Sequence, residues 1–164
     1  MTTSERTTCQ LEIHRNLLAE PQRVWRALVE PSQAEVWFAA AAKISAERGG
    51  AYELFWQPDT PEHNSTIGCR ITAIAPCHYL AFTWRGPDVL RMIMNEGNPP
   101  PPPTHVTITL SPTAIGTDVG VRHGGFGHDD GWPEAITWHE RSWTACLDNL
   151  EALLSDQPMP HPWS

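Results

Sequence analysis

The clearest pattern of hydrophobic and polar positions lies in residues 129–154, DDGWPEAITWHERSWTACLDNLEALL. At about 100° per residue, the angular step of an α-helix, its large apolar residues fall on one side, with one histidine, His139, among them. Asp129 and Asp130 stand where a helix start favours carboxylates, and Pro133 is compatible only with a first turn. The stretch predicts a helix of about 22 residues, roughly 33 Å long. Its buried face is Trp132, Ile136, Trp143, Cys146, Leu147, Leu150, Leu153 and Leu154.

The chain before this helix follows mostly the two-residue period of half-buried strands. Leu11, Ile13 and Leu17 alternate with polar neighbours, which predicts a first strand. Two short helices, 21–30 and 32–39, follow and are separated at Pro31, because a residue before proline is disfavoured in the helical region. Further strands are predicted at 43–46, 51–57, 66–75, 79–85, 105–110 and 117–123.

This order predicts an α+β fold in which a curved antiparallel sheet of about six to seven strands wraps around the long C-terminal helix. We expect a single domain over residues 9–154, because 164 residues suffice for one core but not comfortably for two. Residues 1–8 are polar and expected to be flexible. Residues 86–103, which include five consecutive prolines, are expected to form an irregular insertion, and residues 155–164 a C-terminal tail.

Composition excludes several classes of partner. A formal charge of −8 argues against nucleic acid, since phosphate backbones are bound by concentrated Lys and Arg. The chain contains no apolar run long enough for a membrane span and begins without the apolar segment of a signal peptide, so a cytoplasmic location is expected. The four cysteines form no CxxC pair, which favours reduced thiols over disulfides or zinc. No metal or other cofactor is predicted.

The aromatic residues are the first candidates for a binding site. Eight tryptophans in a chain of this length need a core, a cavity or an interface to cover them. They could line an apolar pocket for a planar or lipid-like ligand, or they could fill the core themselves. In strand 51–57 either Phe55 or Trp56 could take part. The candidate ligand-binding residues are Trp37, Phe38, Phe55, Phe82, Trp84, His123, Trp132, Ile136, His139 and Trp143.

Two histidines are the second candidates. Strand alternation turns His123 inward from the last strand, and helical phase turns His139 inward from the long helix. Two imidazoles in an apolar cavity could serve as acid–base groups, because histidine titrates near neutral pH. They could equally bind a ligand oxygen, or be core histidines whose hydrogen bonds are satisfied.

Several segments together resemble the activator of Hsp90 ATPase homologue 1-like domain of the START/Bet v 1-like (SRPBCC) superfamily. The resemblance covers roughly residues 9–155, and the proline run and the tail depart from it. Its marks are Arg15, Ala19 to Pro21, Val24-Trp25-Arg26-Ala27-Leu28, Glu30-Pro31, Trp37-Phe38, Gly49-Gly50, Gly68, Leu80-Ala81-Phe82-Thr83-Trp84, residues 104–110, Gly116-Thr117, His123-Gly124-Gly125-Phe126 and Gly131-Trp132.

The resemblance implies a helix-grip fold with a cavity between the sheet and the C-terminal helix, where relatives commonly hold hydrophobic ligands. The leading hypothesis is a protein that binds a hydrophobic small molecule without transforming it. The first alternative is a cyclase or hydrolase-like enzyme that uses His123 or His139. The second is a chaperone-related interaction module. Trp138 lies about 120° from the buried stripe and is a candidate for a homodimer contact or for packing under the tail.

Overall fold

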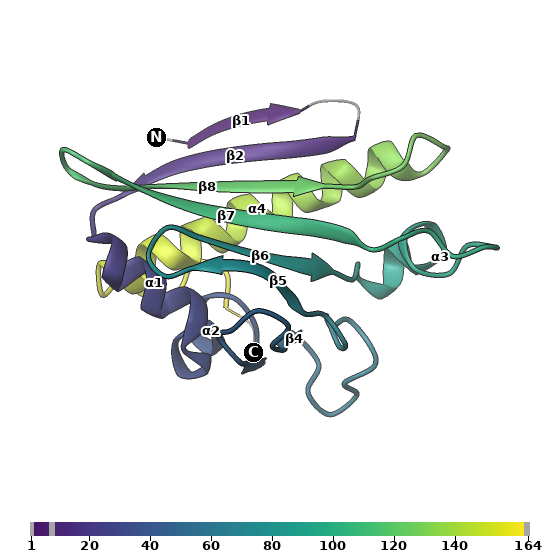
Figure 1. Cartoon of the computed structure of the whole chain (residues 1–164), viewed down its shortest axis with the longest axis horizontal. Coiled ribbons are helices and arrows are strands. Elements are labelled where there is room, and N and C mark those ends of the chain that lie inside the picture. The colour runs from purple at the N-terminus through teal and green to yellow at the C-terminus, as the bar shows by residue number, and fades with distance from the viewer. Residues whose placement is uncertain (1, 7–8, 163–164) are drawn as a thin grey trace.

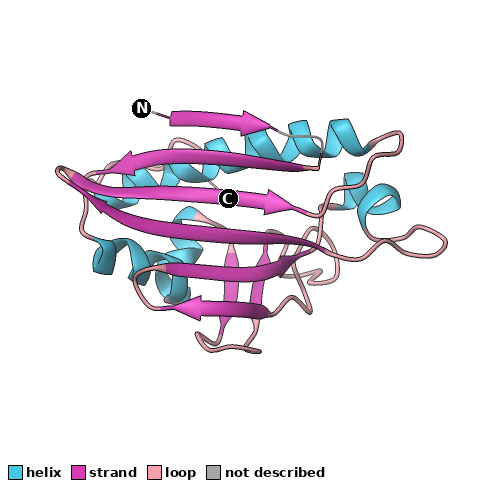
Figure 2. Ribbon diagram, turned by 45° about the horizontal axis from the view of Figure 1, so that its top comes forward, coloured by secondary structure: helices cyan, strands magenta, loops and turns pink. Residues whose placement is uncertain are grey.

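A computed structural model describes residues 2–6 and 9–162 of the chain (Figure 1). Its helices lie on one face of a long, twisted antiparallel sheet (Figure 2). In chain order the elements are β1 (Thr2–Arg6), β2 (Gln10–Leu17), α1 (Pro21–Val29), α2 (Pro31–Trp37), β3 (Ala41–Ile44), β4 (Tyr52–Phe55), β5 (Ile71–Ala75), β6 (Tyr79–Trp84), the 3₁₀ turn η1 (Asp88–Leu90), α3 (Arg91–Met94), β7 (Thr104–Thr113), β8 (Gly116–Gly124) and α4 (Trp132–Leu154).

The main sheet has six strands in the order β1-β2-β8-β7-β6-β5, and every neighbouring pair is antiparallel. Strand β2 buries every second residue, from Leu11 to Leu17, as its sequence pattern predicts. Strands β3 and β4 form a separate two-stranded sheet, which crosses the direction of the main strands steeply (Figure 2). The α+β helix-grip fold predicted from the sequence is confirmed.

Helix α4 spans 23 residues and runs along the sheet, against which its apolar stripe packs. Its start lies three residues later than Asp129, because Gly131 adopts a left-handed backbone with φ 91° and Pro133 occupies the first turn. A Cβ at Gly131 would also lie within 2.5 Å of the Ile93 side chain. The left-handed backbone is therefore the reason that this turn favours glycine, and a larger residue would also displace the end of the Ile93 side chain.

The two short helices are joined through Glu30 and Pro31, as the sequence predicts. Buried polar atoms of aromatic side chains fix their positions. Trp37 of α2 donates its indole N–H to the carbonyl of Ala27 (2.7 Å), and Tyr52 of β4 donates its hydroxyl to the carbonyl of Leu28 (2.8 Å). The small sheet and the two helices therefore form one packed unit beside α4.

Three local expectations differ from the structure. Residues 2–6, part of the segment expected to be flexible, pair along β2 as strand β1, because an edge strand can pair through its backbone without an apolar pattern of its own. Met1 and residues 7–8 of that segment lie outside the described residues. The insertion 86–103 contains η1 and α3 before its proline run. The strand predicted at 43–46 begins earlier, as β3, and together with β4 it forms a sheet of its own that is not part of the main sheet.

Candidate functional site

A cavity of about 390 Å³ lies at the flank of α4, where β6 ends. The helix supplies one wall, and the opposite walls come from the end of α2, the segment after β4, the segment after β6 and the folded-back tail. Its lining residues are Phe38, Trp56, Gln57, Asn64, Ser65, Trp84, Arg85, Pro87, Trp138, His139, Ser142, Trp143, Ala145, Cys146, His161 and Pro162. The cavity is thus displaced from the centre of the sheet–helix interface towards one side of the helix.

Five aromatic side chains make the inner surface of this cavity, namely Phe38, Trp56, Trp84, Trp138 and Trp143. Their rings contact one another: Trp84 and Trp143 have centroids 5.3 Å apart, and Phe38 and Trp143 5.5 Å apart. Such offset and tilted pairs are the favourable geometries for aromatic rings. Trp56 donates its indole N–H to the carbonyl of Phe38 (3.0 Å). The surface presented to a ligand is therefore mainly apolar ring.

The indole N–H groups of Trp84 and Trp143 donate hydrogen bonds to the two candidate histidines. Trp84 donates to Nε2 of His139 (3.0 Å), and Trp143 donates to Nδ1 of His123 (3.1 Å). The other nitrogen of His139 donates to the carbonyl of Ala135 (2.7 Å). These contacts fix His139 as the neutral tautomer that carries its proton on Nδ1.

His123 is neutral in the opposite tautomer. Because its Nδ1 accepts from Trp143, its Nε2 carries the proton and donates to the Thr104 hydroxyl (2.9 Å). Both imidazoles are fully buried, and their ring centroids are 4.7 Å apart. Burial lowers the pKa of His139 to about 4. Burial, followed by the neighbouring His139 and His105, lowers the pKa of His123 well below its usual value.

This arrangement leaves neither imidazole with a nitrogen for a substrate. A general base needs a lone pair within hydrogen-bond reach of the proton that it removes, and the lone pair of each ring is occupied by an indole. The thiol of Cys146, which lines the cavity, is also unsuited to nucleophilic attack, since burial raises its pKa to about 12. The geometry fits hydrogen-bonded core histidines that support an aromatic wall.

The structure separates the ten predicted site residues into two groups. Phe38, Trp84, His139 and Trp143 line the cavity. Phe55 does not, because it points away from the face of β4 that carries Tyr52 and Leu54, whereas Trp56 lines the cavity. The remaining residues lie outside the lining, buried in the core: Trp37, Phe82, His123, Trp132 and Ile136.

Sequence reasoning missed the parts of the lining that come from irregular segments. Asn64 and Ser65 belong to the β4–β5 loop, and His161 and Pro162 to the tail, so no periodic pattern points to them. Trp138 is 38% exposed, and its helical phase predicts a dimer contact or packing under the tail but no place in a cavity wall. One signal was present for Trp56, because strand alternation groups it with two apolar residues, Tyr52 and Leu54.

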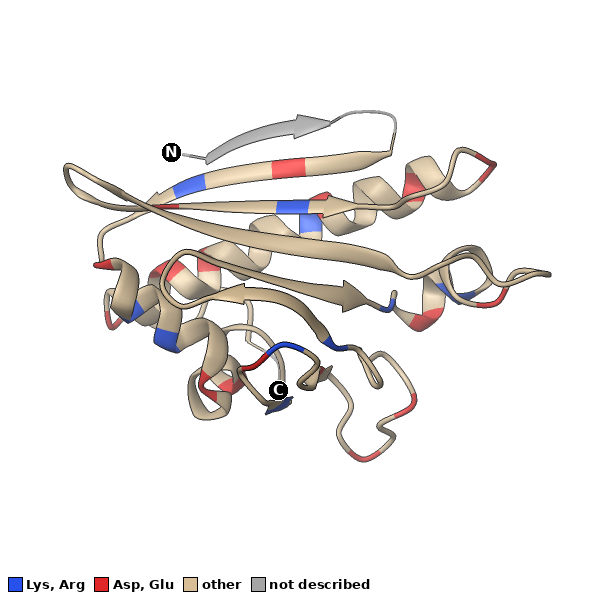
Figure 3. Cartoon of the chain, in the orientation of Figure 1, with Lys and Arg blue, Asp and Glu red and all other residues tan. Residues whose placement is uncertain are grey.

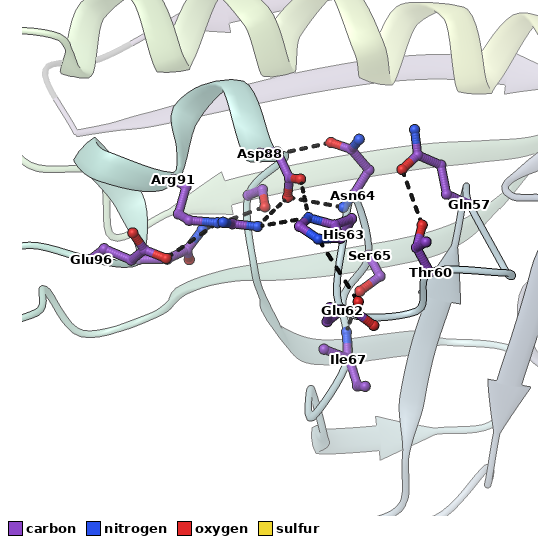
Figure 4. A network of polar contacts seen from close by, with 12 residues as sticks. Gln57, Thr60, Glu62, His63, Asn64, Ser65, Ile67, Asp88, Arg91 and Glu96 are labelled. Atoms are coloured by element: carbon purple, nitrogen blue, oxygen red, sulfur yellow. Dashed lines mark hydrogen bonds and ion pairs between the residues drawn. The ribbon is translucent and has the colours of Figure 1, made fainter.

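A network of polar contacts holds the β4–β5 loop against η1 and α3 (Figure 4). Asp88 accepts from the backbone N–H of Asn64 (3.0 Å), and Asn64 accepts from the backbone N–H of Asp88 (2.9 Å). The second oxygen of Asp88 contacts His63 (2.7 Å), and Arg91 donates to Asp88 (2.8 Å). The Asn64 N–H and then His63 and Arg91 lower the pKa of Asp88. The network therefore fixes the loop side of the cavity rim.

The tail is anchored to α4 through one buried amide. Asn149, fully buried, accepts from the backbone N–H of His161 (3.0 Å) and donates to its carbonyl (2.9 Å). The His161 ring contacts Asp148 (3.1 Å), which also pairs with the buried Arg15 (2.7 Å). Met159, two residues before His161, packs against the core. The tail thereby closes one side of the cavity.

The described part of the chain shows no metal cluster, disulfide or membrane-spanning helix. In residues 2–6 and 9–162, no three His, Cys, Asp or Glu side chains gather as they would around a metal ion. All four cysteines are described and are free thiols. Within the same part of the chain, no helix combines the length and apolar character that a membrane span requires.

Solved structures share this fold. Protein MLL2253 from Mesorhizobium loti superposes with a TM-score of 0.70 at 23% identity, over 90% of this chain and 97% of that one. CalU16 from Micromonospora echinospora gives a TM-score of 0.68 at 21% identity, over 94% and 87%. Ms6760 from Mycobacterium smegmatis gives 0.69 at 16% identity, over 93% and 95%. These similarities show the fold. A comparison with curated protein sequences gives no match.

A comparison with protein families agrees with the resemblance found in the sequence. Residues 18–155 match the family described as activator of Hsp90 ATPase homolog 1-like protein. The matched segment runs from the end of β2 to the residue after α4 and leaves the folded-back tail outside it. With its helix-grip fold and this match over most of its length, the chain belongs to the activator of Hsp90 ATPase homolog 1-like family.

Proposed function

We propose that the protein binds a hydrophobic small molecule with planar rings in the cavity beside α4 and does not transform it. The observation that carries the proposal is the cavity itself, about 390 Å³ in volume and walled by five aromatic side chains. Its volume lies within the range of about 300–1,000 Å³ that is typical of small-molecule sites. A bound planar ligand would remove apolar surface from water on its own side and on the side of the rings.

The state of the two histidines supports binding over catalysis. An acid–base role for His123 or His139 would need a free ring nitrogen in the cavity, and each nitrogen already has a partner within the protein. A chaperone-related interaction module would be favoured by a closed core, and the core beside α4 is open. A homodimer contact and a cytoplasmic location stay predictions of the sequence.

The test uses N-phenyl-1-naphthylamine, an uncharged probe whose fluorescence rises in an apolar site. Ala145 of α4 lines the cavity, so Ala145→Phe places a ring in the space that the ligand would take. Glu151→Phe, at an exposed position of the same helix outside the cavity lining, is the matched control. We expect the unmodified protein and the control to bind the probe and Ala145→Phe to lose binding while its thermal unfolding stays cooperative.

Equal binding by all three proteins would place the probe elsewhere and contradict the proposal. Absence of binding by the unmodified protein would also contradict it. Native mass spectrometry of protein purified from its own host would identify the physiological ligand, because a retained molecule appears as a fixed added mass.

A further inference from the structure

We propose that the ligand carries an anionic oxygen group, such as a carboxylate or sulfonate, which binds at the cavity rim beside Arg85. This inference rests on the proposed function, since it names the class of ligand for the same cavity. It comes from the polar groups at the rim of the cavity, which include one guanidinium and several N–H and O–H donors.

The charges of the lining are opposite to those of the whole chain. The protein has 19 Asp and Glu residues and a formal charge of −8, yet no carboxylate is among the residues that line the cavity. Acidic side chains are spread over the helices, strands and loops (Figure 3). Arg85, the first residue after β6, is the one Lys or Arg of the lining. An anion in this cavity would therefore meet a positive charge and no carboxylate of the lining.

Arg85 has no ion pair with any carboxylate in the part of the chain that the structure describes. The charge of Arg85 acts on the neighbouring thiol of Cys69. Burial raises the pKa of this thiol, and Arg85 is one of the groups that lower it in part. A half-buried guanidinium without an ion-pair partner among the described residues is suited to a planar oxyanion, because its parallel N–H groups match two oxygens.

The neutral polar groups at the rim are also mainly donors. The carbonyl oxygen of Asn64 accepts from Asp88, so its amide nitrogen is left to donate, and Figure 4 draws that nitrogen on the side away from Asp88. The carbonyl oxygen of Gln57 likewise contacts Thr60 (3.5 Å), which leaves its amide nitrogen. The Ser142 hydroxyl makes no hydrogen bond with the described residues. The rim therefore offers N–H and O–H groups to an acceptor-rich ligand.

The apolar inner wall of the cavity and its donor-rich rim together fit a ligand that is an amphipathic acid. Deeper in the cavity the indole N–H groups of Trp56, Trp84 and Trp143 are all bonded within the protein, so these side chains present only ring surface there. A ligand that satisfies both regions has fused or linked rings at one end and an oxyanion at the other. A purely apolar ligand would leave the rim donors in contact with water or unpaired.

Two probes with the same ring skeleton test this inference. 1-Anilinonaphthalene-8-sulfonate carries a sulfonate, and N-phenyl-1-naphthylamine is its uncharged counterpart. Both are titrated into the unmodified protein, Arg85→Gln and Arg26→Gln. Arg26 is exposed on α1, outside the cavity lining, so its replacement makes the same change in net charge.

We expect the sulfonate to bind more tightly than the neutral probe, and its advantage to shrink at high salt. Arg85→Gln should weaken sulfonate binding about tenfold, the size of one charge-assisted hydrogen bond, and leave the neutral probe unchanged. Arg26→Gln should change neither. If the neutral probe binds and the sulfonate has no advantage that depends on Arg85, this inference is wrong and the proposed function stands. If neither probe binds the unmodified protein, both are wrong.

Discussion

The pair of buried histidines predicts a steep loss of stability in mild acid. In the unfolded chain a histidine has a pKa of about 6.5, whereas the pKa of His139 in the folded protein is about 4 and that of His123 is also lowered. Between these two values the unfolded state binds a proton that the folded state does not. Stability is therefore fully present above the unfolded pKa and falls as pH decreases towards the folded pKa.

The magnitude follows from the shift of His139. One pKa unit corresponds to about 1.36 kcal/mol. A shift from about 6.5 to about 4 therefore lowers the free energy of unfolding by about 2 kcal/mol between pH 7 and pH 5, with a slope near 1.2 kcal/mol per pH unit around pH 5.5. His123, whose pKa is also lowered by burial and then by the neighbouring His139 and His105, adds a loss in the same direction.

Urea denaturation followed by tryptophan fluorescence measures this directly from pH 5 to pH 7.5. The informative variant is His139→Gln, because glutamine keeps an acceptor for the Trp84 N–H and cannot titrate. Its stability can be lower at every pH, but its slope between pH 5 and 6 should be shallower by about 1.2 kcal/mol per pH unit. His78→Gln, at an exposed position, is the control and should keep the original slope.

Parallel curves for the unmodified protein and His139→Gln would refute the reasoning. That result would mean that His139 takes up protons equally in the folded and unfolded states, which is incompatible with a neutral, fully hydrogen-bonded ring. It would also reopen the acid–base role that the structure argues against.

Three further predictions follow from the cavity walls. Trp143→Ala should lower the free energy of unfolding by about 3–5 kcal/mol, measured by urea denaturation, because the side chain is buried and its indole N–H is bonded to a core group; a loss below about 1 kcal/mol would contradict its place in the core. Removal of residues 157–164 should speed the association of N-phenyl-1-naphthylamine in stopped-flow fluorescence, because the tail closes one side of the cavity; unchanged rates would show that access lies elsewhere. Asp88→Ala should raise hydrogen exchange at the amide of Asn64, since that N–H loses its acceptor; equal exchange in both proteins would mean that the network does not hold the loop.

The sequence predicts the fold well because the pattern of each main element follows from burial on one face. Leu11, Ile13 and Leu17 alternate along β2 because the helices cover only one side of the sheet. The stripe of α4 has helical period for the same reason. Strand β1 lacks such a pattern, and its pairing through backbone hydrogen bonds could not be read from its side chains.

The cavity could be predicted only in part. A sequence pattern shows which side chains point into the protein, but not whether they fill the core or line a void. Phe82 and Phe38 are both aromatic and fully buried, yet only Phe38 reaches the cavity. The difference depends on how neighbouring rings fill the space, as when Tyr52 stacks on Phe82 with centroids 4.2 Å apart. Loop and tail residues such as Asn64 and His161 reach the lining through tertiary contacts, for which the sequence has no periodic signal.

The histidines explain why the aromatic wall and the polar rim are separate. A buried indole N–H without an acceptor is costly, so two buried tryptophans can present their ring faces to the cavity only if their N–H groups have acceptors within the protein. His123 and His139 supply those acceptors from β8 and α4, and each donates its own ring N–H in a hydrogen bond to a further protein oxygen. The tryptophans deep in the cavity therefore have no free N–H group for a ligand. Polar contacts with a ligand are expected at the rim, from the donors around Arg85. A substitution of either histidine should therefore change stability and ring packing first, and ligand selectivity only through Trp84 or Trp143.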